Sequence, residues 1–101
     1  MGNSEKKALK SHLIVLITHV IKWYSQPWAR SQSWINSINN ARAAIIDITE
    51  EFPSYLRLIE IFTPDACSKA AKIAEKEMGF TPEYKNPSKD DLFEKDYELD
   101  E

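Results

Sequence analysis

Apolar residues recur at helical spacing from about Ser4 to Tyr24, a stretch that contains no proline. One stripe consists of residues three and four apart, namely Leu9, Leu13, Leu16, Val20 and Trp23. A second stripe lies beside it and consists of Ile14, Ile17 and Ile21. A helix that is apolar over so much of its circumference is typically central, with neighbours on more than one side. Pro27 disfavours helical geometry at Gln26, so we expect this helix to end near Tyr24 or Ser25.

A single apolar seam follows after the turn. Its residues repeat at intervals of four and three, namely Trp34, Ile38, Ala41, Ile45, Ile48 and Phe52. Such a regular seam predicts a second amphipathic helix. Ser31 or Ser33 is suited to cap its start by accepting a hydrogen bond from a free backbone amide, and Pro53 ends it.

The chain after Pro53 predicts more helix, with two alternatives. Ser54 is placed to cap a short third helix, whose inner positions are Tyr55, Leu58, Ile59 and Phe62. Thr63-Pro64-Asp65 has the residue order of a new helix start, which gives a fourth helix. The alternative is one long helix kinked at Pro64. In either case Gly79 is suited to end the alanine-rich segment in the left-handed conformation.

These elements predict an all-α fold with a single helical domain over residues 1–89. Two long helices form an antiparallel hairpin with Trp23, Trp28 and Trp34 at its corner, backed by one kinked or two shorter helices. Residues 90–101 hold seven acids against one base, whereas residues 1–89 hold nine acids and twelve bases. Because so acidic a segment has few apolar anchors to offset the entropy of ordering it, we expect a disordered acidic C-terminal tail.

Composition limits the classes of function. A single cysteine, Cys67, excludes an internal disulfide framework, and the N-terminus lacks a signal-peptide pattern, so we expect a cytoplasmic protein. The longest apolar run, Leu13–Ile17, is too short to cross a membrane. His12 and His19 would lie about 10 Å apart along a helix, too far to share a metal ion. We therefore expect no metal, no cofactor and no membrane partner, and we assign no catalytic residue.

The most suggestive residues surround the turn between the first two predicted helices. They are the basic, polar and aromatic residues His19, Lys22, Trp23, Gln26, Trp28, Arg30, Trp34 and Arg42. A pocket built from them would suit a phosphate, a carboxylate or a stacked base, because guanidinium groups and aromatic faces bind these groups. The alternative is structural. In that case the tryptophans pack the corner, the cations bond to free carbonyls at the helix end, and Arg42 reaches back toward the first helix.

These residues also carry a motif. In chain order it comprises His19, Lys22, Trp23, Gln26, Pro27, Arg30, Ser31, Ser33, Trp34, Ser37, Ile38, Arg42, Pro53, Ser54 and Leu56. Over residues 5–80 the chain thereby resembles the bacterial family called domain of unknown function 29, which is abundant in cyanobacteria. The resemblance implies a helical fold and no established activity. Family members usually begin with a further helical segment before the region that resembles Glu5–Leu13, and they carry a Cys-Pro element where this chain has Asn86-Pro87-Ser88.

We therefore predict a small helical protein that acts as a non-enzymatic interaction module. The alternatives are binding of RNA or another polyanion at the corner and, more distantly, a metal-independent nuclease. We expect the first helix to bind a partner, because the second helix can cover only part of its two apolar stripes. A second copy of the chain would cover the rest, which predicts a homodimer with Ile14, Ile17 or Ile21 near the contact.

Overall fold

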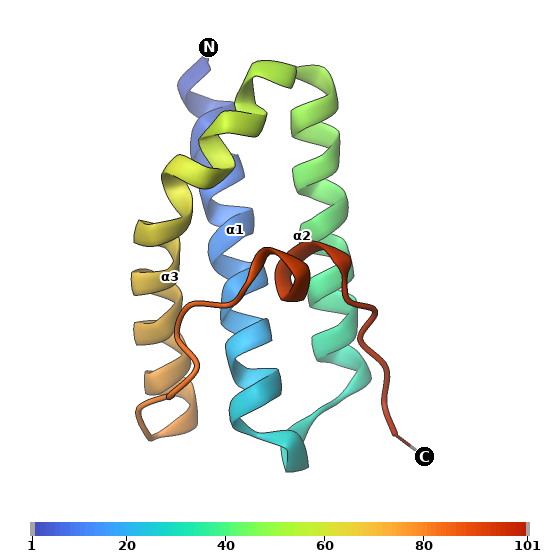
Figure 1. Cartoon of the computed structure of the whole chain (residues 1–101), viewed down its shortest axis with the longest axis vertical. Coiled ribbons are helices and arrows are strands. Elements are labelled where there is room, and N and C mark those ends of the chain that lie inside the picture. The colour runs from blue at the N-terminus through green and yellow to red at the C-terminus, as the bar shows by residue number, and fades with distance from the viewer. Residues whose placement is uncertain (1, 101) are drawn as a thin grey trace.

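The computed structural model describes residues 2–100, with side chains from Ser4 to Asp100, and within that range it contains helices and no strand. The long helices are α1 (Gly2–Ser25), α2 (Gln32–Glu51) and α3 (Leu56–Met78) (Figure 1). The short helical turns are η1 (Pro27–Ala29), η2 (Pro53–Tyr55) and η3 (Asp90–Glu94). The predicted all-α fold is confirmed. Met1 of the predicted domain and Glu101 of the predicted tail lie outside the described residues.

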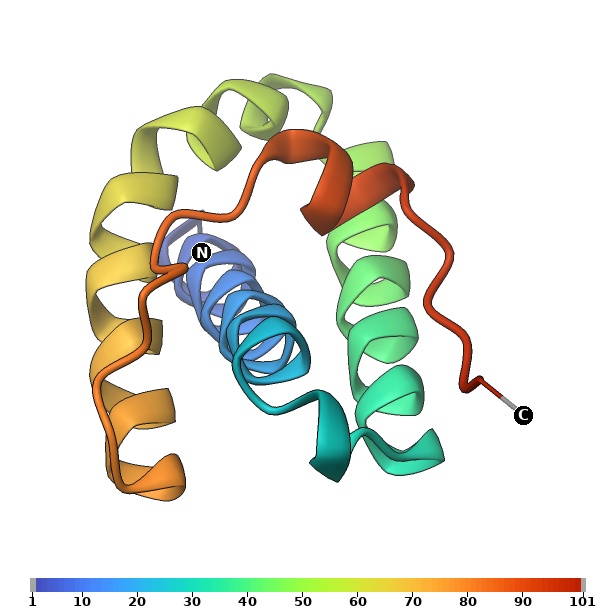
Figure 2. The ribbon, with the colours of Figure 1, turned by 60° about the horizontal axis from the view of Figure 1, so that its bottom comes forward.

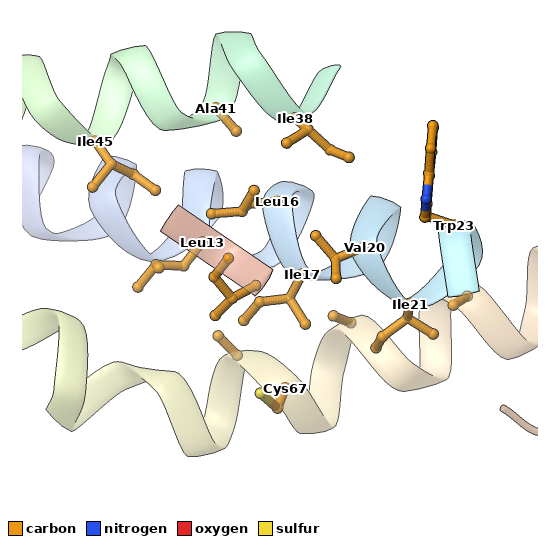
Figure 3. Close-up of a cluster of buried hydrophobic side chains, with 14 of the residues drawn as sticks. Leu13, Leu16, Ile17, Val20, Ile21, Trp23, Ile38, Ala41, Ile45 and Cys67 are labelled. Atoms are coloured by element: carbon orange, nitrogen blue, oxygen red, sulfur yellow. The ribbon is translucent and has the colours of Figure 1, made fainter. Parts of the chain in front are cut away.

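The central element is α1, which packs against both α2 and α3 and runs between them in Figure 2. Its first stripe is fully buried, as the spacing predicted. Ile17 and Ile21 of the second stripe are fully buried too, on the side of α1 that faces α3 (Figure 3). This corrects the predicted dimer contact at these two residues. Because α3 covers them within one chain, they are not available to a partner.

The helix boundaries follow from local chemistry. Helix α1 ends at Ser25, as predicted, and Gln26 before Pro27 has left helical geometry, with φ −131° and ψ 71°. Ser31 caps α2, since its Oγ accepts a hydrogen bond of 3.3 Å from the Trp34 amide. Buried residues of α2 then face α1, namely Ile35, Ile38, Ala41, Ile45 and Thr49.

Helix α3 is one continuous helix with Pro64 inside it, so the kinked-helix alternative is confirmed. Figure 1 shows the bend in its first half, where proline removes one helical hydrogen bond. Its buried side chains are small and allow close approach to α1, namely Ala66, Cys67, Ala70 and Ala74. Gly79 ends the helix at φ +87°, the left-handed conformation that glycine adopts without steric cost.

Residues 80–100, here called the strap, cross the front of the bundle from the end of α3 to α2 (Figure 1). The turn η3 packs on α1, and Leu92 and Tyr97 are only 1% and 5% exposed. This corrects the prediction of a disordered acidic tail. The acidic residues lie mostly on the solvent side, while a few apolar residues at the right spacing enter the core. The amino-acid composition of the segment does not show which of its residues face the core.

Candidate functional site

Of the eight predicted site residues, the structure brings Lys22 to Trp34 and Arg30 to Trp23, but it does not gather the set into one pocket. His19 uses ring nitrogen Nδ1 to donate to the Val15 carbonyl one turn earlier, at 2.8 Å. Lys22 forms an ion pair of 2.8 Å with Glu77, and its Nζ lies 5.0 Å from the centre of the Trp34 ring. Lys22 belongs to α1, Trp34 to α2 and Glu77 to α3. These two contacts of Lys22 therefore attach α1 to both neighbouring helices.

Arg30 closes the end of α1. Its Nε donates to the Trp23 carbonyl at 2.9 Å, and its guanidinium carbon lies 4.6 Å from the centre of the Trp23 ring. A cation at the C-terminal end of a helix is favourable because the last carbonyls lack helical partners. The structural alternative predicted that cations bond to free carbonyls at the end of the first helix, and Arg30 does so.

The three tryptophans behave differently from one another. Trp23 is buried and meets Tyr97 edge to face at 5.2 Å, and Trp34 is half-buried. Trp28 is 75% exposed on η1, so the structural alternative, in which it packs the corner, is wrong for this residue. Pro27 starts a single tight turn there, and that turn directs the next side chain into solvent. Gln26 is half-buried beside it, and its carbonyl accepts from the Ala29 amide at 2.9 Å.

Arg42 belongs to the strap rather than to the corner. Its Nε donates to the Leu92 carbonyl at 2.6 Å, its Nη2 donates to the Asp91 carbonyl at 3.1 Å, and its guanidinium lies 5.4 Å from the Tyr97 ring. Arg42 was expected to reach toward the first helix, and this is corrected. The side chain instead holds the backbone of residues fifty positions later.

A network of tyrosines around Asp91 completes the attachment of the strap. Tyr24 donates to Asp91 Oδ1 at 3.0 Å, Tyr84 donates to Oδ2, and Tyr97 donates to the Asp91 carbonyl at 2.5 Å. Lys95 donates to the Tyr24 hydroxyl at 2.6 Å. Burial raises the pKa of Tyr97 far above the ordinary tyrosine value and raises that of Tyr84 as well. The network joins α1 to the strap through Tyr24.

An apolar hollow that the sequence did not predict lies between α2, the start of α3 and the strap. It has a volume of about 420 Å³, and its lining residues are Ile45, Ile46, Thr49, Leu56, Ile59, Glu60, Lys89 and Phe93. A second hollow of about 200 Å³ adjoins it and shares Ile59, Glu60, Lys89 and Phe93. We call the two hollows together the α2–α3 groove. Ile46 and Leu56 are 52% and 57% exposed on its walls. Both are large apolar residues outside the predicted seams, and Leu56 also belongs to the motif that carries the family resemblance.

Groups with direct chemical reactivity are not gathered at either place. Cys67 is buried, and desolvation raises the pKa of its thiol, which makes it a weak nucleophile. No group of three or more histidine, cysteine, aspartate or glutamate side chains is placed to hold a metal ion among the described residues. Over the same part of the chain, no helix has the length and apolar character needed to span a membrane.

Over residues 2–100, which the structure describes, the fold is a small helical domain of three long helices closed by the strap. The chain belongs to the family described as domain of unknown function DUF29, whose model matches residues 1–98. The match thus includes the strap as far as residue 98, beyond the range of 5–80 that carries the sequence motif. Searches of curated proteins and of solved structures each give no match to the chain.

Proposed function

We propose that the chain is a non-enzymatic protein-interaction module and that its partner binds in the α2–α3 groove. The observation that carries the proposal is the half-exposure of Ile46 and Leu56 on the walls of an apolar hollow. An ion pair of 2.7 Å between Lys89 and Glu60 lies at its rim. Apolar surface bordered by polar residues is typical of protein-binding sites on soluble domains.

The contacts at the corner weigh against the alternative of RNA or polyanion binding there. Lys22 and Arg30 already bond to Glu77 and to the Trp23 carbonyl, and Arg42 is bonded to the strap. A phosphate group would have to displace these contacts before it could bind. By contrast, an apolar side chain entering the groove would displace only water from Ile46 and Leu56.

The test is site-specific photo-crosslinking in the full chain within its own cells. A photoactivatable amino acid replaces Ile46 and, as a matched control, Asn40, which is exposed on α2 but does not line the groove. We expect protein adducts from position 46 alone, and we expect Leu56→Asp to abolish them by placing a charge in the groove. Equal adducts from both positions, or adducts that nuclease treatment removes, contradict the proposal.

A further inference from the structure

The groove is long enough to receive several apolar side chains in a row. Its first hollow lies between Ile46 of α2 and Leu56 of α3, and the second continues along α3 to Pro64. The two hollows meet at Ile59 and Phe93, which line both. A partner that presents apolar side chains along one direction therefore fits better than a single bulky residue.

The backbone around the groove determines what secondary structure such a partner can have. The groove is bordered by α2, α3 and the turn η3, and within the described residues there is no strand edge with free amides and carbonyls. An extended peptide would therefore leave its own backbone groups without partners on an apolar surface, at a cost in free energy. A helix bonds its backbone internally and presents apolar side chains three and four residues apart.

The charges around the groove determine the polar side of the partner. Helix α2 has no cation after Arg42, whereas it carries Asp47, Glu50 and Glu51 there. The turn η3 adds Asp90 and Glu94, next in sequence to the lining residues Lys89 and Phe93, and α3 adds one cation, Arg57, next to Leu56. None of these five carboxylates has an ion-pair partner among the residues that the structure describes, while Lys89 is already paired with Glu60. Glu50 follows Ile46 by four residues and therefore shares its face of α2.

We infer that the α2–α3 groove binds a cationic amphipathic helix of a partner protein, an inference that rests on the proposed function. Apolar side chains of that helix contact Ile46, Leu56 and Phe93. Its lysine or arginine residues flank the apolar stripe and face Glu50 and Glu94. Because Glu50 and Glu94 are exposed and do not line the hollows themselves, they set the preference for charge and the rate of encounter, while the apolar contacts supply most of the affinity.

The test uses a fluorescent synthetic peptide and the full chain, with binding measured by fluorescence anisotropy. The probe is a helical peptide with leucines three and four residues apart and lysines on both sides of the stripe. One control peptide has glutamate at each lysine position, and another has the same composition in an order that destroys the stripe. We expect only the first peptide to bind well, with an affinity that falls as salt concentration rises.

Protein variants locate the site. Leu56→Ala should weaken binding roughly tenfold, and Glu50→Lys should weaken it roughly two- to fivefold. Asn40→Lys adds a positive charge to α2 away from the groove lining and should leave binding unchanged. Equal binding of the lysine and glutamate peptides overturns the inference about charge but leaves the protein-interaction function standing.

Other results separate the inference from the proposed function on which it rests. If no peptide binds but adducts still form from position 46, the inference of a cationic helix is overturned and the proposed function stands. If sedimentation shows self-association that Leu56→Asp abolishes, the occupant is a second copy of the chain, and the inference is again overturned. Absence of both peptide binding and adducts overturns the proposed function as well.

Discussion

The corner between α1 and α2 and the α2–α3 groove are opposite cases. The corner contains the residue types that suggest ligand binding, yet Lys22 and Arg30 are engaged within the chain. The groove contains ordinary aliphatic residues, yet Ile46 and Leu56 remain half-exposed. A side chain is available to bind a partner only where the fold has not already given it one. Residue type alone does not show which side chains are available.

The largest expected effect concerns the strap, which forms one wall of the groove. Leu92→Ala should lower the free energy of unfolding by about 2–5 kcal/mol, because Leu92 is buried in the core and its truncation leaves a cavity. Urea denaturation followed by circular dichroism measures the change. Leu99→Ala is the matched control and should have little effect, since Leu99 is half-exposed. Equal small effects at the two positions would mean that the strap is not part of the core.

The second prediction concerns how the strap is fastened to α2. Arg42→Ala should cost about 1.5–3 kcal/mol, because two charge-assisted hydrogen bonds to the Leu92 and Asp91 carbonyls are lost. The same denaturation experiment measures it. Arg42→Lys should restore only part of the stability, because an ammonium group cannot reproduce the fork of the guanidinium. An unchanged unfolding midpoint for Arg42→Ala would return Arg42 to the list of ligand-binding candidates.

The third prediction concerns alkaline pH. Burial raises the pKa of Tyr97, so the folded chain keeps the phenol proton at pH values where the unfolded chain loses it. This contribution to stability is fully present below the ordinary tyrosine value of 10.0 and is lost as pH rises above it. Thermal unfolding at stepped pH should show the decline. Tyr97→Phe should make the dependence shallower, and an unaltered slope would show that Tyr97 is not responsible.

Much of the fold was predictable because it rests on helical periodicity. The stripes of α1, the Ser31 cap and the stop at Gly79 are local signals, and each was confirmed. The strap was not predictable in the same way. Leu92 and Tyr97 lie in an acidic segment without a clear period, and their burial depends on contacts with α1 and α2 that are distant in sequence.

The candidate site shows the same limit. Arg42 was predicted at the corner, whereas its partners are the Asp91 and Leu92 carbonyls. These are backbone groups, which have no signature in the sequence. Leu56 was part of the motif but was not expected at a binding surface, because the apolar spacing assigned other residues to the inner face of the helix. Its side chain is 57% exposed at the start of α3, where it lines the hollow together with Ile46 of α2.

The smallest expected effect on stability separates the two surfaces from the core. Trp28→Ala at the corner should change the free energy of unfolding by no more than about 0.5 kcal/mol because Trp28 is largely exposed, and Ile46→Asp in the groove should cost about 1 kcal/mol because Ile46 is half-exposed. Chemical denaturation of the two variants checks this. A large loss for Ile46→Asp would indicate that the groove is part of the core in solution.

The most direct test of the central claim is amide chemical-shift mapping of the full chain during titration with the lysine-flanked helical peptide. The groove account predicts that the largest shifts belong to Ile46, Thr49, Leu56 and Phe93, with little change at Trp28 and Arg30. Ile46→Asp should remove the shifts, and Trp28→Ala should leave them in place. Shifts centred on Trp28 and Arg30 that persist in Ile46→Asp would contradict the account and return the binding surface to the corner.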